Sequence, residues 1–154
     1  MRRLAPAALA LLLLPACASV AEEAPAAAPA TEAARPMLTV LTSGDPETQL
    51  MALVLTNAAR AEGVVPRILL CSAAADLALK EPPAEALAPQ QPKGASPAGL
   101  LRELKSEGVT VEVCAIYLPN RPYGAEALED GIGVATPPDI AAAFTAAGTT
   151  VLSF

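Results

Sequence analysis

The chain has 154 residues and a formal net charge of −6, with 53% hydrophobic residues, 3% aromatic residues, and no histidine or tryptophan. The lack of histidine excludes Ser-His-Asp catalysis and removes the commonest metal ligand, and three scattered cysteines argue against a structural zinc site. The acidic balance and the scarcity of aromatics argue against a nucleic-acid surface, and no Gly-rich phosphate fingerprint is present. We therefore expect one domain without metal, nucleotide cofactor or nucleic-acid partner.

The first 17 residues, MRRLAPAALALLLLPAC, have the layout of a secretory signal, with two arginines, an apolar stretch and then small residues. The apolar stretch would form about 16 Å of helix, roughly half of a bilayer core, so it is expected to target the chain without spanning a membrane. LPAC at 14–17 is similar to a bacterial lipoprotein box with Cys17 as the lipidated residue, whereas ACA at 16–18 suits ordinary cleavage. We expect a periplasmic protein, either soluble or a lipoprotein attached to the membrane through its lipidated N-terminus.

Residues 18–36, ASVAEEAPAAAPATEAARP, are mostly alanine, proline and glutamate. Such a segment has little to bury and is typical of an extended, solvated tether. The sequence therefore predicts a signal at 1–17, a linker at 18–36 and a folded domain at 37–154.

The domain opens with an apolar strand and a helix. MLTVLTSG (37–44) reads as a buried strand, after which Asp45 supplies a helix N-cap and Pro46 the first helical residue. Gly63 ends this helix. Its apolar residues recur at helical spacing: Leu50, Met51, Val54, Leu55 and Ala58.

A second strand, VVPRILLC (64–71), leads into an alanine-rich helical turn at 72–80. The following segment, EPPAEALAPQQPKGASP (81–97), is so rich in proline that we expect a mobile loop at the rim of the sheet. The next helix begins at Ser96 and Pro97 and ends at Gly108. Three leucines form its buried stripe: Leu100, Leu101 and Leu104.

The remaining elements continue the alternation: a strand at 109–114, a short helix at 123–129, a strand at 131–135, a helix capped by Thr136, and a strand at 149–154. This pattern predicts an α/β fold, a three-layer doubly wound sheet of about five mainly parallel strands. Sites in such folds gather at the carboxyl ends of the strands. We expect the strand order 2-1-3-4-5.

Cys114 is the last residue of the predicted strand at 109–114 and lies at this carboxyl edge. A free thiol has a pKa of about 8.5, which helix amides or a cation such as Arg121 can lower toward about 7. The position therefore suits a reactive thiol. Simple packing of a small apolar side chain remains the alternative.

Three segments resemble the DsrE/DsrF-like sulfur-relay family: TVLTSGDPETQLMALVLTNAARAEG, LLRELKSEGVTVEVCAIYLPNRPYG and DGIGVATPPDIAAAFTAAGTTVLSF. The resemblance covers essentially all of 37–154 and implies a DsrE-like fold. It also implies that Cys114 carries sulfane sulfur as a persulfide, and that Arg121 lies near an arginine-glycine segment following the cysteine in relay members. The expected partners are sulfur donor and acceptor proteins or small sulfane-sulfur species, and the expected assembly is a homotrimer or homohexamer.

A non-catalytic, oligomeric ligand- or protein-binding module with the same fold is the alternative function. A third hypothesis concerns Cys71, which ends the strand at 64–71 as Cys114 ends the next one. In the order 2-1-3-4-5 the first strand separates them by about 9.6 Å, beyond the roughly 7 Å that a disulfide tolerates. We therefore expect Cys71 to be packed, with a thiol–disulfide switch requiring loop movement.

Overall fold

The computed structural model describes residues 35–154, so the predicted signal, Cys17 and nearly all of the predicted linker lie outside the described residues. The elements, with η for a 3₁₀ helix, are β1 (Arg35–Leu41), α1 (Pro46–Ala61), β2 (Val64–Leu70), η1 (Ser72–Ala78), α2 (Ala84–Leu87), α3 (Pro97–Ser106), β3 (Thr110–Cys114), η2 (Leu118–Asn120), η3 (Ala125–Ala127), β4 (Gly133–Ala135), α4 (Pro137–Thr145) and β5 (Thr150–Ser153). No helix in this part of the chain is long and apolar enough to cross a membrane.

The three predicted helix starts are confirmed. The side chains of Asp45, Ser96 and Thr136 each accept a hydrogen bond from a backbone N–H in the first turn of α1, α3 and α4, and a proline follows each cap. Gly63 and Gly108, each one residue beyond the C-cap of α1 or α3, take φ angles of 80° and 91°, a conformation that glycine adopts without steric cost. Local sequence therefore determines where these helices begin and end.

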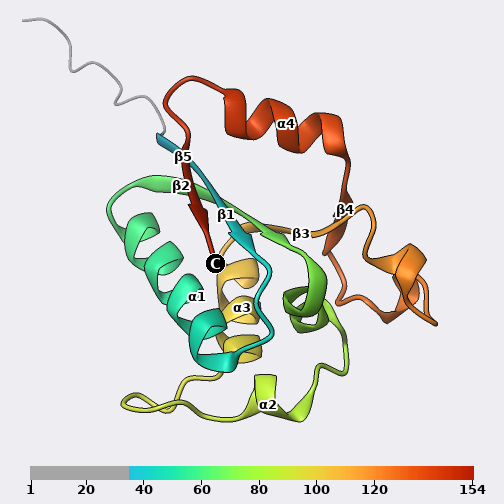
Figure 1. The fold of residues 1–154 in the computed structure, drawn as a ribbon. Coiled ribbons are helices and arrows are strands. Elements are labelled where there is room, and N and C mark those ends of the chain that lie inside the picture. The colour runs from blue at the N-terminus through green and yellow to red at the C-terminus, as the bar shows by residue number, and fades with distance from the viewer. Residues whose placement is uncertain (1–34) are drawn as a thin grey trace, which may run out of the picture. The chain divides into compact units, whose positions relative to one another are not determined.

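All five strands are parallel, and their order across the sheet is β4-β3-β2-β1-β5. The chain steps in one direction from β1 to β4, and then returns across the sheet to place β5 beside β1. Because parallel crossovers are right-handed, the forward and return connections lie on opposite faces. Accordingly, α1 and α3 cover one face and α4 covers the other, which confirms the three-layer α/β prediction (Figure 1).

The expected strand order 2-1-3-4-5 is wrong. β2 lies directly between β1 and β3, so the strands that end at Cys71 and Cys114 are neighbours. Sequential strands pair in most sheets, and here each forward connection follows that tendency. The reversal of direction comes at the β4–β5 connection and not at β1.

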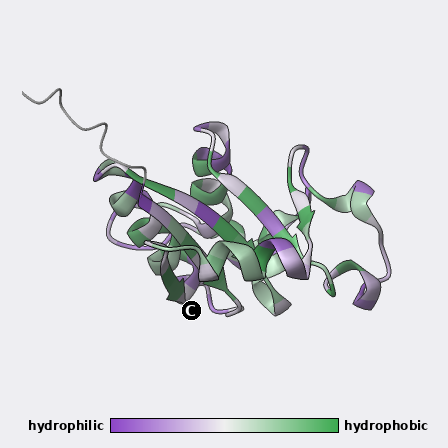
Figure 2. Ribbon diagram, turned by 90° about the horizontal axis from the view of Figure 1, so that it is seen from above, coloured by the Kyte–Doolittle hydropathy of each residue, from purple (hydrophilic) through white to green (hydrophobic). Residues whose placement is uncertain are grey.

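The two faces of the sheet differ in their packing. The face toward α1 and α3 carries a large cluster of buried residues that includes Leu41, Leu53, Leu70 and Leu101, all at most 1% exposed. In the part of the chain that the structure describes, the cluster on the opposite face has three buried residues, Leu38, Leu69 and Ala135. Green, apolar stretches alternate with purple positions along the strands in Figure 2. The α1/α3 face is therefore the main core, and we call the opposite one the α4 face.

The apolar residues that revealed α1 do not form its buried side. Ala52, Leu53 and Thr56 face the core, whereas Met51, Val54 and Leu55 are 55%, 46% and 43% exposed. We call the exposed set Met51, Val54, Leu55 and Ala58 the α1 stripe. Helical spacing correctly identified the helix, but the side that packs on the sheet is the one with smaller and more polar residues.

The predicted rim loop at 81–97 has structure of its own. It contains α2, which packs against α3 and buries Ala86 in the main core. A hydrogen-bonded turn follows, in which the N–H of Gln90 donates to the carbonyl of Ala95. Proline content predicted an unstructured segment, but one buried alanine and a turn give it a defined course.

Candidate functional site

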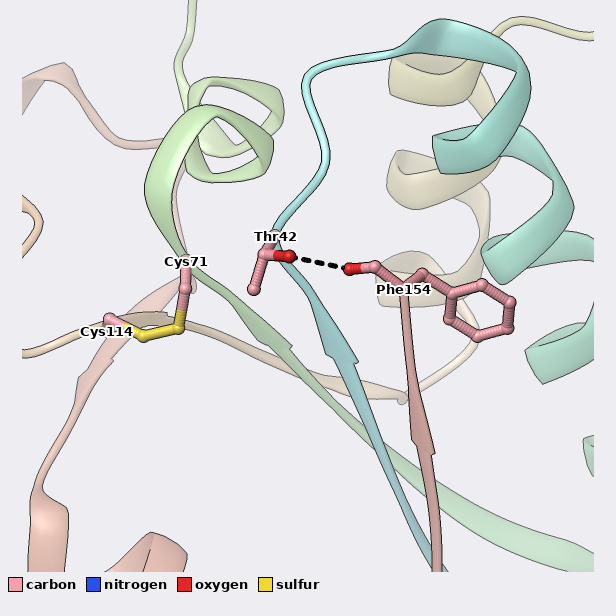
Figure 3. Close-up of a disulfide and its surroundings, with 4 residues drawn as sticks. All are labelled: Thr42, Cys71, Cys114 and Phe154. Carbon is pink, nitrogen blue, oxygen red and sulfur yellow. Dashed lines mark hydrogen bonds between the residues drawn. A yellow bond between two sulfur atoms is a disulfide. The ribbon is translucent and has the colours of Figure 1, made fainter.

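The carboxyl ends of four strands meet at one rim (Figure 3). Cys114 is the last residue of β3, and the neighbouring strands β2, β1 and β5 are followed directly by Cys71, Thr42 and Phe154. Backbone hydrogen bonds tie these ends together: the N–H of Cys71 donates to the carbonyl of Leu41 at 2.8 Å, and that of Thr42 to Phe154 at 2.8 Å. The Thr42 hydroxyl donates to the same Phe154 carbonyl at 2.7 Å. The ends of β2, β1 and β5 are thus hydrogen-bonded to one another at the rim.

Cys71 and Cys114 form a disulfide across this rim, with Cα atoms 5.1 Å apart. The expectation that Cys71 is merely packed is wrong, because adjacent parallel strands lie within the 4.4–6.8 Å that a disulfide spans. Both cysteines are half-buried and pack against the small cluster of the α4 face. The pair is therefore accessible at the edge of the sheet and is not sealed in the main core.

A hydrogen-bonded cluster lies on the segments that follow the two cysteines. The hydroxyl of Tyr117, which is 3% exposed, donates to the Asp76 carboxylate at 2.7 Å. That leaves the Tyr123 hydroxyl, 2.9 Å away, to donate to Tyr117. Burial, followed by the hydrogen bonds with Tyr123 and Asp76, raises the pKa of Tyr117 above its usual value. Tyr117 therefore stays protonated and holds the loop after Cys114 against η1 after Cys71.

Arg121 joins this cluster. Its guanidinium lies 4.7 Å from the centre of the Tyr117 ring and 3.7 Å from an Asp76 oxygen. Arg121 thus contacts the residues that brace the loop after Cys114, and its predicted role as a thiolate stabiliser stays a prediction.

The sequence reading did not assign a role to Asp76, Tyr117 or Tyr123. Two tyrosines six residues apart, in a chain containing only two, were the available signal. Their partner Asp76 belongs to a segment 41 residues before Tyr117. The cluster forms only because β2 and β3 are adjacent, so the wrong strand order concealed it.

The chemistry available at the rim is thiol chemistry. Two cysteines within bonding distance can exist as a dithiol or as a disulfide, and a reduced strand-end thiol can attack a sulfane sulfur. Among residues 35–154, no group of three or more histidine, cysteine, aspartate or glutamate residues is arranged to hold a metal ion.

The chain has an α/β fold of the DsrE-like kind, with paired cysteines at the carboxyl edge of its sheet. Among solved structures, the chain is similar to the ychN protein from E. coli, with a TM-score of 0.61 and 22% identity over 79% of this chain and 99% of that one. It is also similar to MTH1491 from Methanobacterium thermoautotrophicum, described as a protein of unknown function, with a TM-score of 0.56 and 17% identity over the same shares. No protein-family model and no curated protein matches the chain. These likenesses establish the fold.

Proposed function

We propose that the chain is a member of the DsrE-like sulfur-relay proteins and carries sulfane sulfur as a persulfide on Cys114. The observation that carries the proposal is the position of Cys114, which is half-buried at the carboxyl end of β3 and forms a disulfide with Cys71. A cysteine that serves only as core packing is inert, whereas this one is placed to react. Reduction of the disulfide would free the Cys114 thiolate for a sulfur donor, either a partner protein or a small sulfane-sulfur species.

Mass spectrometry tests this loading. The full chain carrying Cys17→Ser and Cys71→Ser is reduced, freed of reductant under anaerobic conditions, and incubated with an inorganic polysulfide. We expect one additional sulfur on the peptide containing Cys114, and none on a matched Cys17→Ser, Cys114→Ser chain that keeps Cys71. A folded Cys71→Ser chain that gains no sulfur at Cys114 would contradict the proposal.

We propose that Arg121 stabilises the Cys114 thiolate once the disulfide is open. Arg121 lies on the loop that follows Cys114, and its guanidinium contacts the Tyr117 ring and the Asp76 carboxylate. In the Cys71→Ser chain, Arg121→Gln should raise the thiol pKa, seen as a shift of the pH profile of alkylation to higher pH. Arg121→Lys should shift the profile less. Arg102→Gln, which removes a cation paired with Glu129, serves as the control; equal profiles in all four chains would exclude this role.

The α1 stripe favours a second function, that of an oligomeric binding module. Met51, Val54 and Leu55 are large apolar side chains exposed on one helix, and contiguous exposed apolar surface marks interaction sites. Under this proposal the chain forms a homotrimer or homohexamer and needs no reactive thiol.

Sedimentation velocity of the full chain tests the assembly that this second function requires. Val54→Lys with Leu55→Lys should dissociate an assembly that depends on the α1 stripe, and Cys114→Ala should leave it intact. Glu47→Lys, an exposed change outside the stripe, is the charge control. A monomer at all concentrations would remove this second candidate.

We also propose export to the periplasm, with Cys17 either lipidated as a membrane anchor or adjacent to an ordinary cleavage site. The N-terminal sequence supports this proposal, and so does the disulfide, because disulfides form and persist in oxidising compartments. Fatty-acid labelling of cells expressing the chain or its Cys17→Ala variant separates the two routes, because only a lipoprotein loses its label and its membrane association in the variant.

A further inference from the structure

The two cysteines of the rim are held in register by the strands that carry them. Leu70 pairs with Val113 in the parallel ladder, so Cys71 and Cys114 occupy the next level of adjacent strands. Both backbones are fixed there, since the Cys71 N–H donates to Leu41 at 2.8 Å and the Cys114 carbonyl accepts from Tyr117 at 2.9 Å. With Cα atoms 5.1 Å apart, their sulfurs bond without movement of either strand.

The backbone immediately after Cys71 supports a functional reading of this position. Ser72 has a φ of 54°, which places a residue other than glycine in the left-handed region. Such a conformation costs on the order of 1 kcal/mol or more and persists only where the surrounding structure imposes it. Ser72 directly follows Cys71 and is the first residue of η1, so this conformation lies at the junction between the rim and that helix.

We infer that Cys71 is a resolving cysteine that discharges the sulfur carried by Cys114 as hydrosulfide, an activity that rests on the proposed sulfur loading of Cys114. First, the Cys114 thiolate attacks the outer sulfur of a persulfide RS–SH, forming Cys114–S–SH and releasing RS⁻. The Cys71 thiolate then attacks the Cys114 sulfur. The bond from that sulfur to the outer sulfur breaks, and HS⁻ leaves with the electron pair and the persulfide proton.

The electrons of this second step balance within the chain. The carried sulfur is reduced to hydrosulfide, and the two cysteine thiols are oxidised to the disulfide that the structure contains. An external dithiol reductant then opens the disulfide by thiol exchange and restores both thiols. The intramolecular attack gains from fixed proximity, which raises effective concentrations far above those of free thiols. The disulfide is therefore the spent form of the site.

Release of sulfide from the reduced protein tests the inference. Three full chains are compared, all carrying Cys17→Ser: one with both rim cysteines, one with Cys71→Ser and one with Cys114→Ser, with Cys71→Ala as a second variant should the serine disturb folding. Each is reduced, freed of reductant, and given one equivalent of a low-molecular-weight persulfide. Sulfide and intact mass are followed against a protein-free control.

The chain with both cysteines should release about one equivalent of sulfide and end two hydrogen atoms lighter than its reduced form. Cys71→Ser should keep the extra sulfur on Cys114 and release sulfide at least roughly tenfold more slowly. The Cys114→Ser chain should neither take up sulfur nor release sulfide.

Equal persulfide lifetimes with and without Cys71 would overturn the inference and leave the sulfur-carrier proposal standing. A Cys71→Ser chain that takes up no sulfur would instead overturn the sulfur-carrier proposal itself. Sulfur retained on Cys71 in the Cys114→Ser chain would overturn the assignment of the two roles.

Discussion

The two faces of the sheet differ in how many apolar side chains they bury and in which of them carries the cysteines. Within residues 35–154, the face toward α1 and α3 buries most of the apolar side chains, whereas α4 contributes no buried residue and the cluster on its face has three. Yet the cysteines point to the α4 face, where they pack beside Leu69 and Ala135. The main core stabilises the fold, so the α4 face can be sparsely packed where the accessible disulfide lies.

The largest expected effect is on the main core. Leu53→Ala removes a side chain with no exposed surface, and a cavity of this kind lowers the free energy of unfolding by about 2–5 kcal/mol. Phe144→Ala on α4, where the ring is 50% exposed, should change it by about 0.5 kcal/mol or less. Urea unfolding measures both. Similar losses for the two variants would show that α4 packs more closely than the structure indicates.

The disulfide should have the next largest effect, because it links the strands where packing is sparse. It closes a loop between residues 43 positions apart, and its reduction should lower the free energy of unfolding by about 2–4 kcal/mol. The comparison is urea unfolding of the Cys17→Ser chain with and without reductant. A chain that also carries Cys71→Ser and Cys114→Ser is the control and should not respond. Unchanged stability of the first chain would mean that the bond does not persist in solution.

Removal of a helix N-cap should have a smaller effect on stability, and the effect should differ between the two faces. Ser96 and Thr136 play the same part at the start of α3 and α4, each accepting a backbone N–H. Ser96→Ala should cost about 1 kcal/mol of global stability because α3 is anchored in the main core. Thr136→Ala should mainly raise amide exchange within α4, since a helix without buried residues opens locally. Equal global losses would contradict this difference between the faces.

The smallest effect is a pH dependence at the start of α1. Hydrogen bonds from the backbone N–H and hydroxyl of Thr48 lower the pKa of Asp45 below its usual 3.8. The stabilisation is therefore fully present above that value and is lost as the pH falls through the lower pKa of the folded state. Asp45→Asn should flatten this part of the acid unfolding curve while leaving stability near neutral pH almost unchanged. An identical acid curve would exclude the carboxylate as a contributor.

Comparison of α1 with α3 shows what helical spacing leaves undecided. The leucine stripe of α3 and the apolar positions of α1 have the same spacing, yet Leu101 and Leu104 are buried while Met51, Val54 and Leu55 are exposed. Period alone identifies a helix and cannot say which side packs. In α1 the close approach to β1 is made by Thr56, whose hydroxyl lies 2.8 Å from that of Thr39.

Local sequence was sufficient to predict the boundaries of α1 and α3, the start of α4, the alternation of strands and helices, and the placement of Cys71 and Cys114 at strand ends. These depend on interactions within a few residues, such as a cap accepting an N–H or a glycine with positive φ. Tertiary structure alone decided that β2 lies beside β3, and hence that the two cysteines pair and that Asp76 meets Tyr117. Strand order depends on contacts between residues about 40 positions apart, and the local pattern of each strand is compatible with several neighbours.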